Sequence, residues 1–155
     1  MARILMIAGV FSFTALLSCI SPKSDYELSI QKGKIIKQEE KTYWDIPTTL
    51  TNNTNDTLRY YSMSCSWQDY YSVDNQKLEV RGSDCDKNIP KILTLNPGQK
   101  KSVDIQLVIS QPMDGPEIKF RIGFNLIIAP KNKNSFDFED GLEKKNVIWS
   151  NPISM

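Results

Sequence analysis

Apolar and polar residues alternate along most of the chain beyond Tyr26, so that side chains of one kind recur at every second position. A β-strand sends successive side chains to opposite faces of a sheet, whereas an amphipathic helix repeats about every 3.6 residues. The alternation therefore predicts strands, and it is longest over residues 117–129. This long core strand is expected to direct inward Ile118, Phe120, Ile122, Phe124, Leu126 and Ile128.

Two other segments alternate almost as regularly and are also predicted to be strands. Residues 57–67 are expected to turn Tyr61 and Trp67 to the core and Tyr60 to solvent, with a wet face formed by the serines in between. Residues 102–110 are expected to direct inward Val103, Ile105, Leu107 and Ile109.

Weaker strand patterns are separated by clusters of Asn, Asp, Gly and Pro, which favour turns because Asn and Gly tolerate positive φ and Pro presets the first turn position. The weaker strands are expected at residues 26–31, 34–38, 42–51, 70–73, 77–81, 92–95 and 146–149. Seven to nine short strands without an amphipathic helix predict an all-β fold, an antiparallel immunoglobulin-like β-sandwich formed by a single domain of residues 26–155. The polar segment 131–145 is expected to be a loop, and both a functional and a purely mobile loop remain open.

The first 19 residues have the layout of an export signal. Arg3 precedes an apolar run over residues 4–17, which is shorter than the roughly 20 residues that span a bilayer. The sequence Leu16-Leu17-Ser18-Cys19 resembles the lipobox of bacterial lipoproteins. This resemblance implies a cleaved signal peptide of residues 1–18, palmitate-type acyl chains on Cys19, and a lipidated tether of residues 19–25.

The lipobox resemblance also implies a location. Several acyl chains, each contributing about 0.8 kcal/mol per buried methylene, would attach the protein permanently to a membrane. Ile20 stands where inner-membrane retention signals carry Asp, so the outer membrane is expected. A periplasmic orientation is expected by default, and the cell surface remains an alternative.

Cys65 and Cys85 remain once Cys19 is assigned to the lipid. An even pair of cysteines in an exported protein favours a disulfide. The alternative, a pair of free or redox-active thiols, lacks the Cys-x-x-Cys spacing that lowers a thiol pKa.

Composition excludes several classes of function. The 155 residues include 19 Lys+Arg and 18 Asp+Glu but no His, which excludes catalysis by imidazole and histidine ligation of zinc. A net charge of +1 without a basic block does not predict nucleic-acid binding. The acidic residues between 137 and 143 lack the spacing of a calcium loop, and no glycine motif for nucleotides occurs. No metal, cofactor or enzymatic activity is predicted.

Tyr60, Tyr70 and Tyr71 are the candidate binding residues. Exposed tyrosines can stack on sugar rings or anchor a protein interface, although packing across a sheet is the other interpretation of such a cluster.

Separately, Asp56-Thr57-Leu58 resembles a short motif on which some bacteria O-glycosylate exported proteins, so Thr57 is a candidate glycosylation site.

The layout of residues 50–98, including the turn Asn96-Pro97-Gly98, resembles small bacterial immunoglobulin-like modules and the BsuPI-type proteinase inhibitor domain. The resemblance implies a sandwich fold more than a function. The sequence therefore predicts a membrane-anchored, noncatalytic interaction module whose partner is a protein of the cell envelope. A carbohydrate-binding module that uses the exposed tyrosines, with an envelope glycan as ligand, and a proteinase-inhibitor-like domain remain alternatives.

Overall fold

The computed structural model describes residues 23–38, 41–110, 117–131 and 146–155. In these residues the fold is all-β and antiparallel, apart from one 3-10 helix, η1 (Trp67–Tyr70), and none of its helices is long and apolar enough to cross a membrane. The strands are β1 (Tyr26–Ile30), β2 (Lys34–Gln38), β3 (Lys41–Asn52), β4 (Leu58–Met63), β5 (Tyr71–Val73), β6 (Leu78–Val80), β7 (Pro90–Leu95), β8 (Lys100–Ile109), β9 (Lys119–Phe120), β10 (Ile122–Asn125), β11 (Val147–Trp149) and β12 (Ile153–Ser154).

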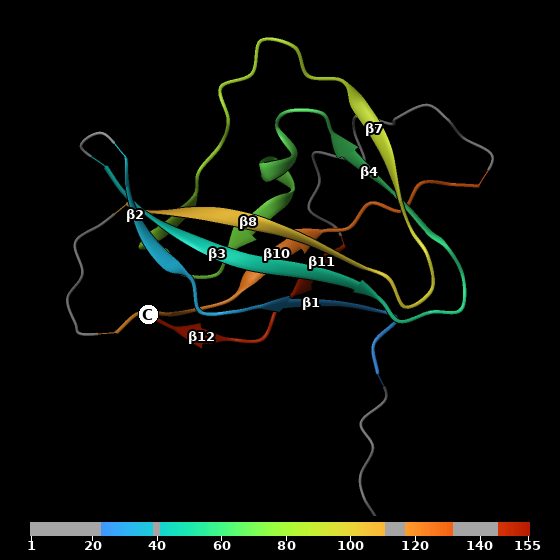
Figure 1. Ribbon diagram of the computed structural model, residues 1–155, viewed down its shortest axis with the longest axis horizontal. Coiled ribbons are helices and arrows are strands. Elements are labelled where there is room, and N and C mark those ends of the chain that lie inside the picture. Colours follow the sequence, from blue (N-terminus) through green and yellow to red (C-terminus); the bar gives the residue numbers. More distant parts are fainter. Residues whose placement is uncertain (1–22, 39–40, 111–116, 132–145) are drawn as a thin grey trace, which may run out of the picture.

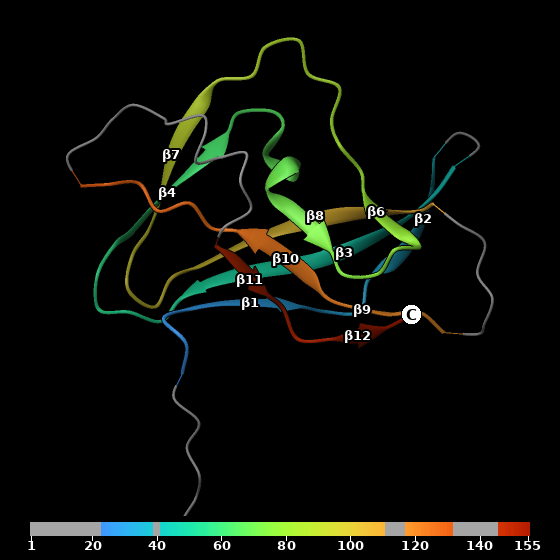
Figure 2. The same ribbon diagram turned by 180° about the vertical axis from the view of Figure 1, so that it is seen from behind.

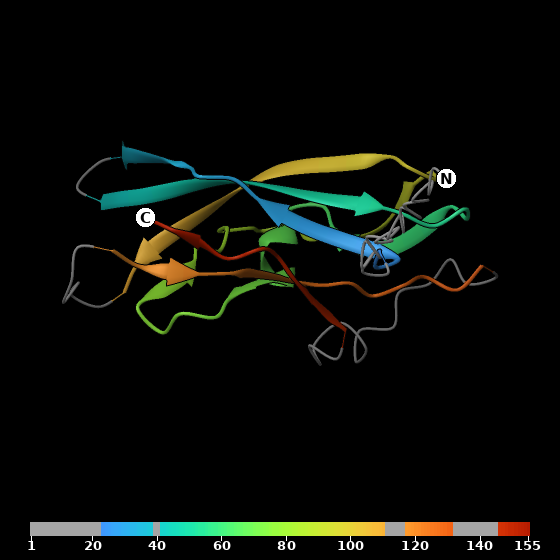
Figure 3. The same cartoon turned by 90° about the horizontal axis from the view of Figure 1, so that it is seen from below.

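Two layers pack face to face, and Figure 3 shows them edge-on. One layer has the strand order β1-β3-β8-β6, with β2 also paired to β3. The other contains β11-β10-β5, the pair β12-β9 and the antiparallel pair β4-β7 (Figures 1 and 2). The predicted antiparallel β-sandwich is thus confirmed, whereas its immunoglobulin-like topology stays a prediction.

The two longest strands of the first layer follow the predicted alternation. On β8, Ile105 and Leu107 are fully buried, while Val103 and Ile109 are half-buried on the same face. On β3, the inward residues are Trp44, Ile46, Thr48, Leu50 and Asn52, and all of them are buried. These two strands pair along nine residues and together cover one side of the core.

A β-bulge separates β1 from β2, which lie one after the other along the same edge of β3. Ile30 pairs with Thr48 and Lys34 with Asp45, so residues 31–33 oppose only residues 46–47. Pro47, which has no N–H, faces this bulge and accepts a 3.0 Å hydrogen bond from the backbone of Gln31. A Cβ at position 33 would lie 2.1 Å from the carbonyl oxygen of Asp45, so the bulge requires glycine there.

The prediction of one continuous strand over residues 117–129 is wrong. This segment is divided into β9 and β10, because between them side chains, and not a neighbouring strand, accept the backbone hydrogen bonds. The backbone N–H of Arg121 donates to the side chain of Asp74 (2.7 Å), and that of Ile122 donates to the side chain of Ser150 (3.0 Å). The predicted inward position of Ile128 is also wrong, since this side chain is 53% exposed.

The alternation shifts by one position near Ile128 because the chain leaves β10 and pairs with β4. The carbonyl of Ile127 accepts from Tyr61 (2.9 Å), and the N–H of Ala129 donates to Arg59 (2.8 Å). Ile127 and Ala129 are consequently buried, and Ile128 faces solvent.

The expected faces of residues 57–67 require a second correction. β4 ends at Met63, and Trp67 begins η1 instead of continuing the strand. Tyr60 is buried like Tyr61, because its ring packs at a right angle on Phe124 with the ring centroids 6.0 Å apart. The predicted wet serine face is therefore a packed face, and Ser62 and Ser66 are buried.

Asn52 forms hydrogen bonds at the end of the sandwich where residues 23–25 lead into β1. Its side-chain amide donates to the carbonyls of Leu95 and Asp56, both at 2.8 Å, and its side-chain oxygen accepts from the backbone and hydroxyl of Thr54. The neighbouring Asn53 forms hydrogen bonds with the backbone of residues 24–25, which lead into β1. Asn52 was expected in a turn, but it is the last residue of β3 and fully buried.

Candidate functional site

One edge of the first layer is only half covered. β6 pairs with Leu107–Ile109 of β8, and one further hydrogen bond joins the N–H of Arg81 to the carbonyl of Gln106 (2.8 Å). In the described part of the chain no strand pairs with the outer side of residues 100–105, which we call the open edge. Figure 1 shows this side of β8 facing η1 and the β4-β7 pair.

The open edge presents backbone groups at alternate residues. Both the N–H and the C=O of a strand residue point to the same side, and the direction reverses at each residue. The backbone groups of Gln106 point away from β3, because its carbonyl accepts from the N–H of Arg81. The backbone groups of Ser102 and Asp104, which lie at steps of two along β8, point the same way, and both residues are exposed. Their N–H and C=O groups are available to a further strand, since among the described residues no backbone or side-chain bond to them is formed on that side.

A hollow of about 320 Å³ opens between the inner side of the open edge and the β4-β7 pair. We call it the aromatic cleft, because a continuous series of rings forms its wall. Trp67 meets Tyr71 edge-on with the centroids 6.0 Å apart, and Tyr71 in turn packs on Phe124 at 4.7 Å. Val103 of β8 lines the opposite side. Rings held by one another form a wall that is already in place before a ligand arrives.

The charge at the mouth of the aromatic cleft is positive. Lys91 of β7 and Lys101 of β8 both line it, both are exposed, and neither forms an ion pair with a described carboxylate. The phenols of the wall carry no charge: burial raises the pKa of Tyr60, and burial together with the neighbouring Tyr60 raises that of Tyr71. Two ammonium groups thus stand beside an apolar surface without compensation.

A second hollow, of about 690 Å³, lies on the outer side of β8 and is polar. Arg81 lies across it, with its guanidinium 4.3 Å from the ring centre of Tyr43 and bonded to the side chain of Gln106 (2.9 Å). Asp84 and Asp104 supply negative charge on the other walls. Among the described residues no three Cys, Asp or Glu side chains come together as metal ligands would.

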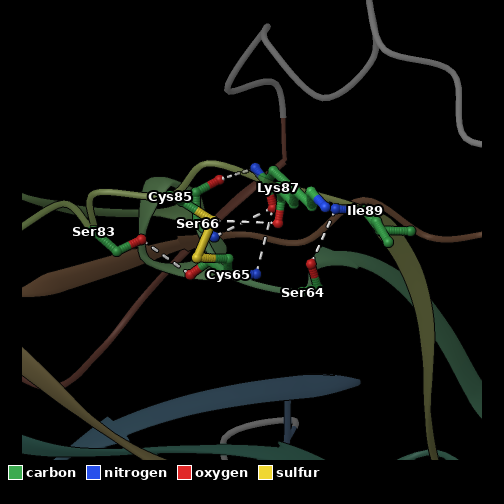
Figure 4. The surroundings of a disulfide bond; sticks show 8 residues. Ser64, Cys65, Ser66, Ser83, Cys85, Lys87 and Ile89 are labelled. Carbon is green, nitrogen blue, oxygen red and sulfur yellow. Dashed lines mark hydrogen bonds between the residues drawn. A yellow bond between two sulfur atoms is a disulfide. The ribbon is translucent and has the colours of Figure 1, made fainter.

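A disulfide joins Cys65 to Cys85, as predicted from the sequence, with their Cα atoms 6.1 Å apart. It connects the segment after β4 to the loop between β6 and β7 (Figure 4). Hydrogen bonds lie on both sides of it: Ser83 donates to the carbonyl of Cys65 (3.0 Å), and the N–H of Ile89 donates to the hydroxyl of Ser64 (3.0 Å). These connections hold the start of η1, and therefore the tryptophan of the cleft wall.

The three predicted binding tyrosines occupy different positions. Tyr60 and Tyr70 are buried, so the expectation of exposed ring faces is wrong for both, because β4 and η1 each pack against the core. Tyr71 is half-buried, and it lines the aromatic cleft together with Tyr60. The lysines and Phe124 were missed, since the pairing that brings them together spans strands distant in sequence.

Some of the other predicted sites lie outside the described residues, and one lies within them. Cys19, the signal peptide and most of the 131–145 loop lie outside the described residues. Thr57 is exposed, and its hydroxyl lies 3.2 Å from the side-chain oxygen of Asn96. An exposed hydroxyl at a turn is accessible to a modifying enzyme, and its glycosylation stays a prediction.

Comparison with known proteins adds no family: no protein-family model matches the chain, and no curated protein matches it.

Proposed function

We propose that this chain is a noncatalytic lipoprotein of the bacterial outer membrane and that its β-sandwich binds an envelope protein at the open edge of β8. The lipobox ending at Cys19 supports the anchor, and the neutral balance of the mature chain supports recognition by local contacts instead of long-range attraction. Cleavage before Cys19 would remove Arg3 and leave equal numbers of basic and acidic residues.

The observation that carries the proposal is the open edge. Proteins commonly cover or charge an exposed strand edge, because its free N–H and C=O groups are a template for another strand. In many recognition domains a partner segment is added at such an edge, with affinity from backbone bonds and specificity from pockets for alternate side chains. Here the free groups of Ser102 and Asp104 lie beside the aromatic cleft, which is a pocket of this kind.

The two alternative functions have weaker support. A carbohydrate-binding module needs exposed ring faces, and Tyr60 and Tyr70 do not provide them, which leaves Trp67 and Tyr71 at the cleft. An inhibitor-like domain would use loops near residues 111–117 or 131–145, which lie almost entirely outside the described residues. We therefore favour strand addition over both.

The anchor is tested by intact-protein and peptide mass spectrometry on the protein taken from native membranes. We expect a chain that begins at Cys19, with acyl chains on that residue, because the lipobox directs cleavage and lipidation together. The Cys19→Ala variant should lack acyl chains and leave the membrane fraction. A wild-type protein that carries no lipid would contradict the anchor.

The partner site is tested by photocrosslinking in intact cells. A photoreactive amino acid at Lys100, on the open edge, is expected to give a discrete adduct with one envelope protein. The same amino acid at Lys37, exposed on β2, is the matched control and should not give it. The adduct should disappear in an Asp104→Pro background, which removes an edge N–H that β3 does not use. An adduct that is insensitive to this proline would contradict binding at the open edge.

A further inference from the structure

We infer that the partner strand carries an aromatic or large apolar side chain opposite Val103 and an acidic side chain opposite Lys101, two positions away on the same face. This inference rests on the proposed function, because it specifies the chemistry of the segment that would pair with the open edge. It follows from three observations on β8 and on the two hollows beside it.

The first observation is the direction of the side chains on β8. Ile105 is buried in the core, so Val103 and Lys101, which follow at steps of two, point to the same inner face. A strand added at the open edge has the same period, and side chains directly opposite one another lie on the same face about 5 Å apart. The residues opposite Val103 and Lys101 therefore face the aromatic cleft.

The second observation is the shape and lining of the aromatic cleft. Its volume of about 320 Å³ admits one large side chain, and its wall consists of the edges and faces of Trp67, Tyr71 and Phe124. Aromatic rings prefer offset or edge-to-face contact with one another, and such pairs contribute to binding beyond the area that they bury. A phenylalanine, tyrosine or tryptophan opposite Val103 matches this lining best.

The third observation is the uncompensated charge. Lys101 and Lys91 stand at the mouth of the cleft without a described carboxylate partner, and exposed pairs of this kind become stronger when a partner excludes water from them. An acidic side chain opposite Lys101 would neutralise the site. The polar hollow on the other face contains both Arg81 and Asp84, so the alternate positions of the partner strand need no particular charge.

The experiment uses the purified full-length chain and two labelled nine-residue peptides of identical composition. The first peptide has glutamate and phenylalanine two positions apart, on one face of an extended strand, within a threonine and serine background. The second peptide has the same two residues adjacent, on opposite faces. Fluorescence anisotropy is expected to show binding of the first peptide at least about tenfold tighter than that of the second, which corresponds to about 1.4 kcal/mol.

Variants separate the two parts of the inference. Lys101→Glu should weaken the first peptide about tenfold, and a peptide with lysine in place of glutamate should recover binding to that variant. Lys119→Glu, an exposed change of the same charge on β9, is the control and should have no effect. Asp104→Pro should abolish binding, whereas Asp104→Ala, which keeps the N–H, should not. Because Lys101→Glu alters only an exposed side chain, it tests the inference even where the proline variant fails to fold.

The inference is overturned if both peptides bind equally, if Lys119→Glu weakens binding as much as Lys101→Glu, or if neither peptide competes with the photocrosslinked partner. It is also overturned if the chain dimerises through the open edge and Asp104→Pro yields monomers, since the occupant would then be a second copy. Failure of the peptides with the crosslink at Lys100 intact rejects the partner chemistry alone. Loss of the crosslink itself rejects the proposed function.

Discussion

Replacing Asn52 by Asp is expected to lower the free energy of unfolding by about 4 kcal/mol. The change removes the two amide donors that satisfy the carbonyls of Leu95 and Asp56, and it places a carboxylate beside those oxygens in a fully buried position. Each unsatisfied buried polar group costs about 1–3 kcal/mol, and a buried charge without a partner costs more. Urea unfolding followed by tryptophan fluorescence measures the loss.

The pH dependence of this variant gives an independent check. Burial and the facing carbonyls would raise the pKa of the introduced carboxyl above its unfolded value of about 4, so the unfolded state loses its proton first. The destabilisation should therefore be smallest at acidic pH and grow as the pH rises above 4. Asn55→Asp, an exposed change in the same loop, should alter stability by less than about 0.5 kcal/mol. A similar loss at both positions would contradict the role assigned to Asn52.

The second large effect is expected at the disulfide. Replacing Cys65 and Cys85 together by Ser should lower the free energy of unfolding by about 3 kcal/mol, because the cross-link closes a segment of 20 residues and restricts the unfolded chain. The same replacement should weaken binding at the aromatic cleft, since it frees the loop that holds η1. A reductant should shift the urea midpoint of the wild type and leave that of the double variant unchanged.

The double variant is its own control for nonspecific effects of the reductant. If reduction leaves the wild-type midpoint unmoved, the cross-link does not contribute to stability in solution.

Combining the cysteine replacements with Asn52→Asp tests whether the two sites contribute to stability independently, because they lie at opposite ends of β4. Distant sites normally have additive effects to within about 0.5 kcal/mol.

Sequence periodicity predicted the first layer well and the second poorly, for a physical reason. β3 and β8 alternate because one face of each meets the core along its whole length. The segment over residues 117–129 also alternates, but its hydrogen-bonding partner changes midway, which moves Ile127 inward and Ile128 outward. The alternation of apolar and polar residues indicates which face of a strand is buried. It does not indicate which neighbouring strand that strand pairs with.

The candidate site was predicted only in fragments. Assigning Cys19 to the predicted lipid left Cys65 and Cys85 as a pair, which was sufficient to predict the disulfide, and the inward direction of Val103 followed from its strand. The opening of the edge depends on β6 having only three residues, and nothing in the sequence of β8 indicates how far its neighbour extends. Tyr60 was misplaced because periodicity assumes one wet face, whereas the face of β4 that carries Tyr60 packs on β10.

The opposite side of the first layer differs from the open edge in a way that limits assembly. The side chain of Asn151 accepts from the N–H of Ile30 (2.9 Å) and donates to its carbonyl (3.2 Å), so the backbone groups of Ile30 are not available to another strand. Beyond it, β2 presents Lys34 and Lys37, and lysines on an edge discourage pairing. Among the described residues of this side, Ile30 therefore offers no backbone groups to a second strand, and the lysines of β2 discourage one. We expect the complex to end as a discrete pair and not to grow into a fibre.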